Sequence, residues 1–190
     1  MIWRIDTPWH KYALIAELAQ RLQAQPSQFG KTSLQKMIYL LQELKGVPIG
    51  YQFCLYTHGP FAAQILGDLD LVEALGAVKV QYIISRFGGY QISPGNECES
   101  IRCKASEFLK ENKEAIDEVV NEFGKYSAKE LELRSTIVYL DRDVKRSKKD
   151  LSRQSFVGLV KKIKPRFSEE TITRALDELQ NKDYLVTRKA

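Results

Sequence analysis

Apolar residues recur three or four positions apart over the first 45 residues, and this spacing predicts two amphipathic helices. The first stripe consists of Tyr12, Ile15, Leu18, Ala19 and Leu22, and the second of Leu34, Met37, Ile38, Leu41 and Leu44. Thr7 and Pro8 are typical of a helix start, as cap and first helical residue. Thr32 and Gln35 have the spacing of a capping box, and we expect Gln35 to face outward on the second helix.

The segment that follows predicts strands around a third helix. Residues 51–56 are rich in aromatic side chains and predict a short strand, and Gly59 and Pro60 are expected to break this strand and open the third helix. Val78, Val80, Tyr82 and Ile84 then recur at every second position, with Lys79 and Gln81 between the first three, and Gly88-Gly89 predicts a tight turn into a return strand at 90–92. Three helices followed by a hairpin is the order of a winged helix, here over residues 7–92.

The rest of the chain returns to a helical pattern. We predict one helix over about 99–123, one beginning at Ser127, and two more over about 151–164 and 168–181. The last pair, followed by residues 184–187, has the order of a helix-turn-helix with a short wing. The predicted fold is mainly α with a small antiparallel β hairpin. It has a winged-helix-like domain at 1–95, a helical extension packing on it at 96–145, and a basic helix-turn-helix-like tail at 146–190.

Composition narrows the class of protein. The 190 residues are 44% hydrophobic and 28% charged, which is ordinary for a globular protein. The apolar runs are too short for a membrane span, and the first residues lack a secretory pattern, so we expect a soluble, cytoplasmic protein. Cys54, Cys98 and Cys103 contain no close pair and the chain has two histidines, so we expect neither a metal site nor a cofactor.

The positive charge is concentrated in one segment. Residues 142–166 contain ten basic and two acidic residues, a local charge of +8 in a chain of net charge +5. The basic residues are Arg142, Lys145, Arg146, Lys148, Lys149, Arg153, Lys161, Lys162, Lys164 and Arg166. Such a block suits a nucleic-acid backbone or an acidic protein. A solvated connector and one hydrated helix face explain the block equally well.

The third predicted helix carries the opposite charge. No Lys or Arg occurs between residues 46 and 78, and the helix contains Asp68, Asp70 and Glu73. Three uncompensated carboxylates oppose entry into a DNA groove, so we expect this first winged helix to bind protein or to be structural. The hairpin residues that could touch a backbone or a partner are Lys79, Arg86 and Phe87, although an exposed tip alone explains them.

Several motifs together resemble a known family. They are Gly30–Leu40 (GKTSLQKMIYL), Leu55–Phe61 (LYTHGPF), Leu66–Asp70 (LGDLD), Leu75–Val78 (LGAV) and Leu131–Leu140 (LELRSTIVYL). In this order they resemble the SocA-like Panacea antitoxin domain and the related YwgA-like proteins. The resemblance implies a mostly helical fold with a small hairpin, and it implies binding of a toxin or delivery of a client to a protease. It implies no catalytic residues.

Four aromatic and imidazole side chains, Tyr39, Tyr56, His58 and Phe61, lie within these motifs. One interpretation is a contact patch for a protein partner. The alternative, which the sequence favours, is core packing, with His58 bound to backbone at a turn.

The sequence therefore predicts binding and no catalysis. Cys54 and His58 are four residues apart on a predicted strand and turn, with no third group to orient them as nucleophile and base. We expect a non-enzymatic, macromolecule-binding regulator of the antitoxin or proteolysis-adaptor type, with a toxin or client as its protein partner. The alternative is a winged-helix DNA-binding transcriptional regulator that contacts nucleic acid through the basic tail. A homodimer is compatible with both.

Overall fold

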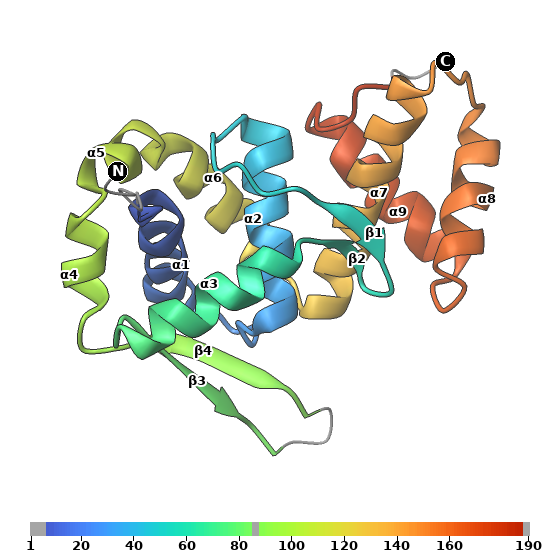
Figure 1. Ribbon diagram of the computed structural model, residues 1–190. Helices are drawn as coiled ribbons and strands as arrows, with labels where there is room; N and C mark the ends of the chain where they lie inside the picture. Colours follow the sequence, from blue (N-terminus) through green and yellow to red (C-terminus); the bar gives the residue numbers. More distant parts are fainter. Residues whose placement is uncertain (1–6, 85–87, 188–190) are drawn as a thin grey trace, which may run out of the picture. The chain divides into compact units, whose positions relative to one another are not determined.

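The computed structural model describes residues 7–84 and 88–187, and these residues are mainly helical with two small antiparallel strand pairs (Figure 1). The helices are α1 (Trp9–Leu22), α2 (Lys31–Lys45), α3 (Ala63–Ala74), α4 (Cys98–Cys103), α5 (Ser106–Glu111), α6 (Lys113–Phe123), α7 (Ala128–Arg146), α8 (Arg153–Ile163) and α9 (Glu169–Asn181). The strands are β1 (Cys54–Tyr56), β2 (Gly59–Phe61), β3 (Val78–Tyr82) and β4 (Tyr90–Pro94). The prediction of a mainly α fold with a small hairpin is confirmed. None of the described helices is both long and apolar enough to cross a membrane.

The chain forms two compact units. Unit 1 consists of residues 1–52 and 62–128, and unit 2 of residues 53–61 and 129–190. The segments 1–95 and 96–145 predicted from the sequence divide the chain elsewhere, because the 53–61 segment belongs with the C-terminal helices and α4, α5 and α6 belong with α1.

Unit 1 is built around α1. This helix packs against α3, α4 and α6, and the side chains of its predicted apolar stripe are buried. The stripe of α2 from Leu34 to Leu41 is buried as well, so the helical spacing in this part of the sequence identified the core correctly.

The predicted helix starts are displaced in the structure. Trp9 is the first helical residue of α1 and Pro8 its cap, while α2 begins at Lys31 after Gly30, with no side-chain cap at either start. Gln35 does not face outward, because its buried amide accepts from the Ala62 nitrogen (3.0 Å) and donates to the Ala62 oxygen (2.9 Å). The amide thus satisfies buried backbone groups instead of capping its own helix.

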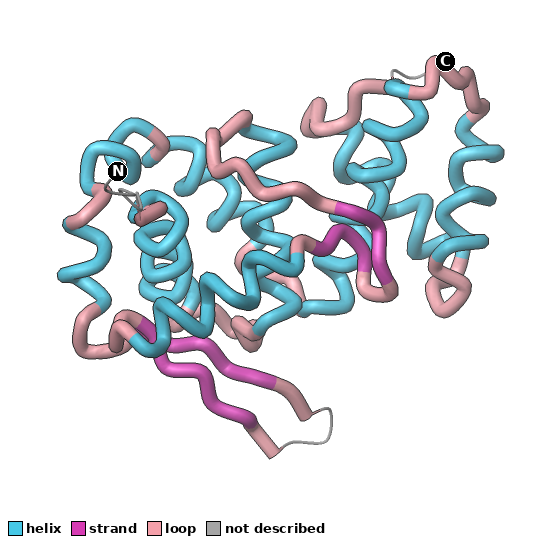
Figure 2. The backbone as a smooth tube through the Cα atoms, in the orientation of Figure 1, coloured by secondary structure: helices cyan, strands magenta, loops and turns pink. Residues whose placement is uncertain are grey.

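The sequence interpretation missed the first strand pair. Gly59 and Pro60 do not open α3; they form β2, which pairs with β1 in the register Cys54↔Phe61 and Tyr56↔Gly59. Gly59 makes the reversal because its φ of 88° lies in the left-handed region that glycine adopts without cost. Figure 2 shows this pair as well as the longer β3–β4 pair, which was predicted and is confirmed.

Two helical predictions in the second half need correction. The single helix over 99–123 is three helices, since the chain leaves helical geometry at Ala105 and again at Asn112. Residues 184–187 are not a strand: the backbone nitrogens of Val186 and Thr187 donate to the buried carboxylate of Asp141 at 2.8 and 3.0 Å.

In unit 2, α8 and α9 pack against each other. Each is capped at its N-terminus by a serine: the Ser152 hydroxyl accepts a hydrogen bond from the Ser155 nitrogen, and the Ser168 hydroxyl accepts one from the Thr171 nitrogen. The apolar side chains buried in this unit include Phe156, Val160, Phe167, Ile172, Leu176 and Leu179.

Candidate functional site

The β3–β4 hairpin of unit 1 exposes large apolar side chains. Ile84 is 95% exposed and Tyr82 is 62% exposed, and Ile83 and Tyr90 are also exposed. The rings of Tyr82 and Tyr90 contact each other edge to face, with centroids 5.4 Å apart. Burying such a surface against a partner removes apolar area from water, which favours association. Arg86 and Phe87 lie outside the described residues.

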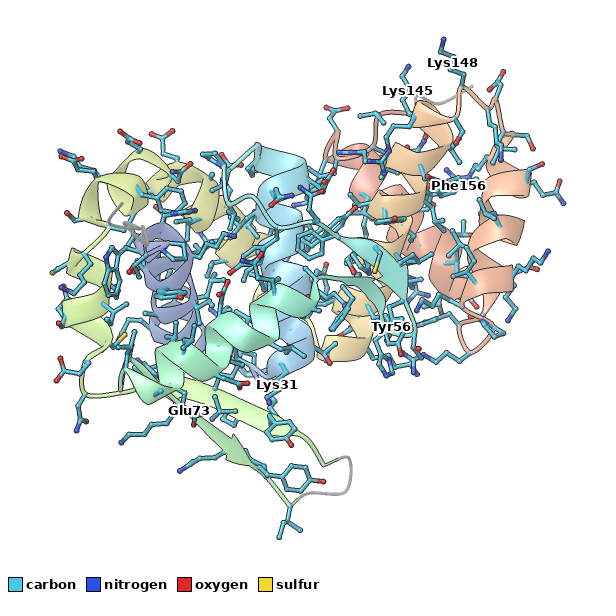
Figure 3. The ribbon with its side chains drawn as sticks, in the orientation of Figure 1. Lys31, Tyr56, Glu73, Lys145, Lys148 and Phe156 are labelled. Atoms are coloured by element: carbon cyan, nitrogen blue, oxygen red, sulfur yellow. The ribbon has the colours of Figure 1, made fainter. Side chains whose placement is uncertain are left out.

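The hairpin is fixed to the helices of unit 1 by polar contacts. The Ile92 nitrogen donates to the Phe29 oxygen at 2.7 Å, and the Gln28 side chain donates to the Tyr90 oxygen at 2.9 Å. Lys31 lies over the Tyr90 ring, 4.3 Å from its centroid, and on the other strand the Val80 nitrogen donates to Glu73 at 2.8 Å (Figure 3). These bonds hold the exposed side chains on a defined support.

The acids of α3 do not form the uniform negative face that the sequence indicated. Asp68 is buried and accepts a 2.7 Å hydrogen bond from the Tyr51 hydroxyl. Burial and that bond raise the pKa of Tyr51 well above its usual range, so the hydroxyl stays a donor. With Glu73 bound to β3, Asp70 is the remaining exposed acid of this set, and the expectation of three uncompensated carboxylates is wrong for Asp68.

The four predicted partner-binding residues do not form one patch. Tyr39 belongs to unit 1 and is 2% exposed, so its ring is part of the core. Tyr56, His58 and Phe61 belong to unit 2, where Tyr56 is 64% exposed and its ring lies 5.6 Å from that of Phe61. Cys54 donates to the Phe61 oxygen, while His58 contacts Glu132, so neither side chain contacts the other.

Glu132 on α7 is the centre of a buried ionic cluster. Its carboxylate pairs with Lys164 (2.8 Å), with Arg166, and with the His58 ring (3.2 Å). Lys164 also donates to the Thr57 oxygen at 2.6 Å, which ties the β1–β2 turn to the end of α8. Burial alone raises the pKa of Glu132, but the hydrogen bond from Lys164 and the charges of Lys164 and Arg166 lower it below its ordinary value. Sequence reasoning missed this cluster, whose only local signal is an acid between the buried residues Leu131 and Leu133.

Half of the residues in the predicted basic block form ion pairs or hydrogen bonds within unit 2. Arg142 binds Asp141 and the Tyr184 oxygen, Arg153 binds Asp177 and Gln180, and Lys161 donates to the backbone oxygens of residues 165 and 167. Lys164 and Arg166 bind Glu132. The exposed remainder, which makes no ion pair with any described residue, is Lys145, Arg146, Lys148, Lys149 and Lys162.

A cavity of about 920 Å³ lies within unit 2, next to this basic remainder. It is lined by the end of α7, the 148–151 connector, the first turns of α8, the later turns of α9 and the 185–187 segment. Among the residues that the structure describes, no three Cys, His, Asp or Glu side chains gather in a way that would hold a metal ion.

The comparison with known families agrees with the motifs. No curated protein matches the chain. The family described as "Antitoxin SocA-like, Panacea domain" matches residues 34–136, which run from α2 into the first half of α7 and include the hairpin. The matched part is more than half of the chain and supports an antitoxin-like regulatory role. The chain therefore belongs to the SocA-like antitoxin family with a Panacea domain.

Proposed function

We propose that this protein is a non-enzymatic, antitoxin-like regulator that binds a protein partner, a toxin or a client, on the exposed apolar surface of its β3–β4 hairpin. The observation that carries the proposal is the group formed by Tyr82, Ile83, Ile84 and Tyr90 on an anchored hairpin. Contiguous exposed apolar groups with tyrosines are typical of protein-binding surfaces.

The surroundings of the hairpin support a protein over DNA as its ligand. The order α1, α2, α3 and hairpin supports a winged-helix arrangement in which the hairpin is the wing. Within the described part of the hairpin, Lys79 is the only basic residue, and the adjacent α3 contributes Asp70 and Glu73. A surface that binds DNA needs several cations to neutralise phosphates, and the described part of this one offers Lys31 and Lys79 beside two acids.

Site-specific photocrosslinking tests the proposal. A photoreactive residue at Tyr82, in cells of the source organism, is expected to give a protein adduct of discrete mass. The same residue at Lys110, exposed on α5 of the same unit, is the matched control. The additional change Ile84→Lys should abolish the adduct, because it places a charge in the apolar contact.

Toxicity then identifies the class of partner. The crosslinked protein, expressed alone, should arrest growth if it is a toxin, and the wild-type chain should restore growth where the Ile84→Lys variant does not. A nucleic-acid adduct at Tyr82, or equal adducts at Tyr82 and Lys110, would contradict the proposal.

A second candidate function, non-specific nucleic-acid binding, is favoured by the five exposed cations of unit 2 that have no acidic partner. Their contact would be with phosphates and would not select a sequence. We expect weak, salt-dependent binding to duplex DNA. Changing Lys145, Arg146, Lys148 and Lys149 to Ala should flatten the slope of log K against log salt by up to about 3.6, or about 0.9 per contact. Changing Lys110 and Lys125 to Ala should leave the slope unaltered, and absence of binding at low salt would end this candidate.

A further inference from the structure

The cavity in unit 2 has the size of a small-molecule site. Its volume of about 920 Å³ is within the range of ligand pockets in proteins. It lies outside the residues that match the antitoxin family, which end at residue 136. All the residues that line it belong to unit 2 and are described by the structure, so it is a property of this unit alone.

Two backbone segments form the walls of the cavity. At the end of α7, Lys148 adopts a φ of 51°, and the Lys149 nitrogen donates to the Val144 oxygen at 3.1 Å. The chain therefore turns across the helix end in a left-handed conformation that is costly for a lysine. On the other side, Asp141 holds the 186–187 backbone in place. Strain of this kind persists where surrounding bonds fix it and is common at binding sites.

The floor and the rim of the cavity differ in chemistry. The apolar residues that line it are Val144, Leu151, Phe156, Leu176, Leu185 and Val186. Lys145, Lys148 and Lys149 surround them, exposed and without an acidic partner among the described residues. Figure 3 shows Lys145 and Lys148 at the end of α7 and Phe156 on α8. Arg153 also lines the cavity but is paired with Asp177, and Asp150 is its one acid.

An apolar floor and a cationic rim require two properties of a ligand. An anionic group gains from the three lysines and from the positive end of the α8 helix dipole. An apolar group gains from leaving water for the floor. Neither inorganic phosphate nor a neutral hydrocarbon would use both features.

We propose that this cavity binds an amphipathic anion, in which a carboxylate or similar head contacts Lys145, Lys148 and Lys149 and an apolar group enters between α7, α8 and α9. Two sources have this chemistry: a free fatty carboxylate, and an acidic peptide segment with a large apolar side chain. Nucleic acid fits less well, because Phe156 is buried in the floor and offers no exposed face for a base to stack on. The site does not depend on the hairpin or on what binds there.

Calorimetric titration of the full chain with defined probes tests the proposal. Decanoate, below its micelle concentration, is expected to bind. Decanol, which has the same chain without the charge, and decyltrimethylammonium, which has the opposite charge, are expected to bind at least about tenfold more weakly. A short peptide of alternating glutamate and leucine residues is the second arm: tighter binding of the peptide assigns the site to a polypeptide, and tighter binding of decanoate assigns it to a free carboxylate.

Two variants and a matched control locate the binding. Lys145→Ala, Lys148→Ala and Lys149→Ala together should weaken decanoate binding at least about tenfold. Val186→Trp places a bulky ring in the lining of the cavity, keeps every lysine, and should weaken decanoate binding. Val186 is exposed and bound to Asp141 through its backbone, so this variant is expected to fold. Lys110→Ala, Lys125→Ala and Lys162→Ala together remove the same charge away from the cavity and should change nothing.

Any of three results would overturn the proposal. One is equal binding of decanoate, decanol and decyltrimethylammonium, which indicates adsorption without a head-group contact. A second is an affinity for decanoate or peptide that Val186→Trp leaves intact, which places the ligand on the surface lysines alone. An oligonucleotide that binds both the wild type and Val186→Trp more tightly than decanoate does would also overturn it, in favour of a phosphate-binding surface.

Discussion

Each unit buries a carboxylate between two cations, but the two carboxylates connect different parts of the structure. Glu17 in unit 1 lies on α1 and pairs with Arg21 of the same helix and with Arg102 of α4. These two helices also pack directly on each other. Glu132 in unit 2 pairs with cations from the end of α8 and the loop before α9, and with His58 from the β1–β2 turn.

The comparison indicates where each unit is vulnerable. The arginines around Glu17 keep about a quarter of their side-chain surface exposed, so water can solvate them if the carboxylate is lost. Lys164 beside Glu132 has 4% of its side chain exposed and cannot be solvated without local opening. A buried cation that loses its partner is strongly destabilising, so unit 2 depends on its carboxylate more than unit 1 does.

The largest expected effect is therefore that of Glu132→Ala. We expect a loss of about 3–5 kcal/mol in the free energy of unfolding of unit 2, and a smaller loss in unit 1 from Glu17→Ala. Urea titration separates the units, because neither tryptophan falls in the residue ranges of unit 2 and Trp9 on α1 reports on unit 1, while far-UV circular dichroism reports on both. Glu132→Ala should lower the dichroism midpoint and leave the fluorescence midpoint in place.

A second substitution sharpens this result. Lys164→Met in the Glu132→Ala background removes the stranded charge and should recover part of the stability. Equal losses from Glu17→Ala and Glu132→Ala would show that the two clusters are equivalent, and no recovery with Lys164→Met would contradict the argument from a stranded buried charge.

The next largest effects concern one glycine in each unit. A Cβ at Gly30 would lie 2.3 Å from the Tyr90 oxygen, and a Cβ at Gly59 would lie 2.8 Å from the Thr136 hydroxyl oxygen. Each change to Ala should cost about 1–3 kcal/mol, in unit 1 and unit 2 respectively, by crowding, and at Gly59 the left-handed φ adds backbone strain. Gly67→Ala in α3 and Gly158→Ala in α8 are the controls: both sites are open, and Ala should stabilise each helix by up to about 1 kcal/mol.

Hydrogen exchange of the β3–β4 hairpin amides distinguishes the destabilisation by Gly30→Ala from that by Gly59→Ala. Gly30→Ala should increase exchange at Ile92, whose nitrogen depends on the Phe29 contact, whereas Gly59→Ala should leave it unchanged. Loss of stability from the control changes as large as that from Gly30→Ala would contradict the crowding argument.

These contrasts also show what the sequence could and could not predict. The stripes of α1 and α2 and the β3–β4 hairpin follow from local periodicity and turn residues, so they were predictable. The family resemblance was predictable because its motifs are contiguous. The bond from Gln35 to Ala62, the burial of Asp68 against Tyr51 and the cluster at Glu132 join residues 17 to 74 positions apart. No local pattern encodes such pairs, so a polar residue predicted to be exposed was in fact buried and paired.

The loss of stability at low pH should also differ between the units, because unit 2 depends more on its buried carboxylate. Hydrogen bonding and the charge of Lys164 hold the folded-state pKa of Glu132 below the unfolded value of about 4.3. A lowered carboxylate pKa gives stability that is present above the unfolded pKa and is lost as pH falls through the folded pKa. Bonds from Lys113 and Arg21 also lower the pKa of Asp117 in unit 1, but that carboxylate is one third exposed, so screening weakens its effect.

We therefore expect unit 2 to lose stability before unit 1 between pH 5 and pH 3. The dichroism midpoint in urea should fall ahead of the fluorescence midpoint over this interval. Glu132→Gln removes the titrating group and should bring the two midpoints back together in their pH dependence. Parallel decline of both midpoints in wild type and variant would assign the acid response to other carboxylates.

The smallest expected effect comes from two residues that follow helices and share a left-handed backbone conformation. Gly46 ends α2 at a φ of 65°, and Lys148 ends α7 at a φ of 51°. Lys148→Gly should stabilise unit 2 by up to about 1 kcal/mol by relieving this conformation, and Gly46→Lys should cost unit 1 a similar amount. If the charge of Lys148 contributes to ligand binding at the cavity rim, Lys148→Gly will weaken decanoate binding while raising the dichroism midpoint. Lys148→Ala will weaken binding without raising the midpoint, because alanine also pays the free-energy cost of a left-handed backbone conformation. A Lys148→Gly variant that is more stable and binds as tightly as wild type would mean that the rim charge at this position contributes nothing, and that the strain has no role in the site.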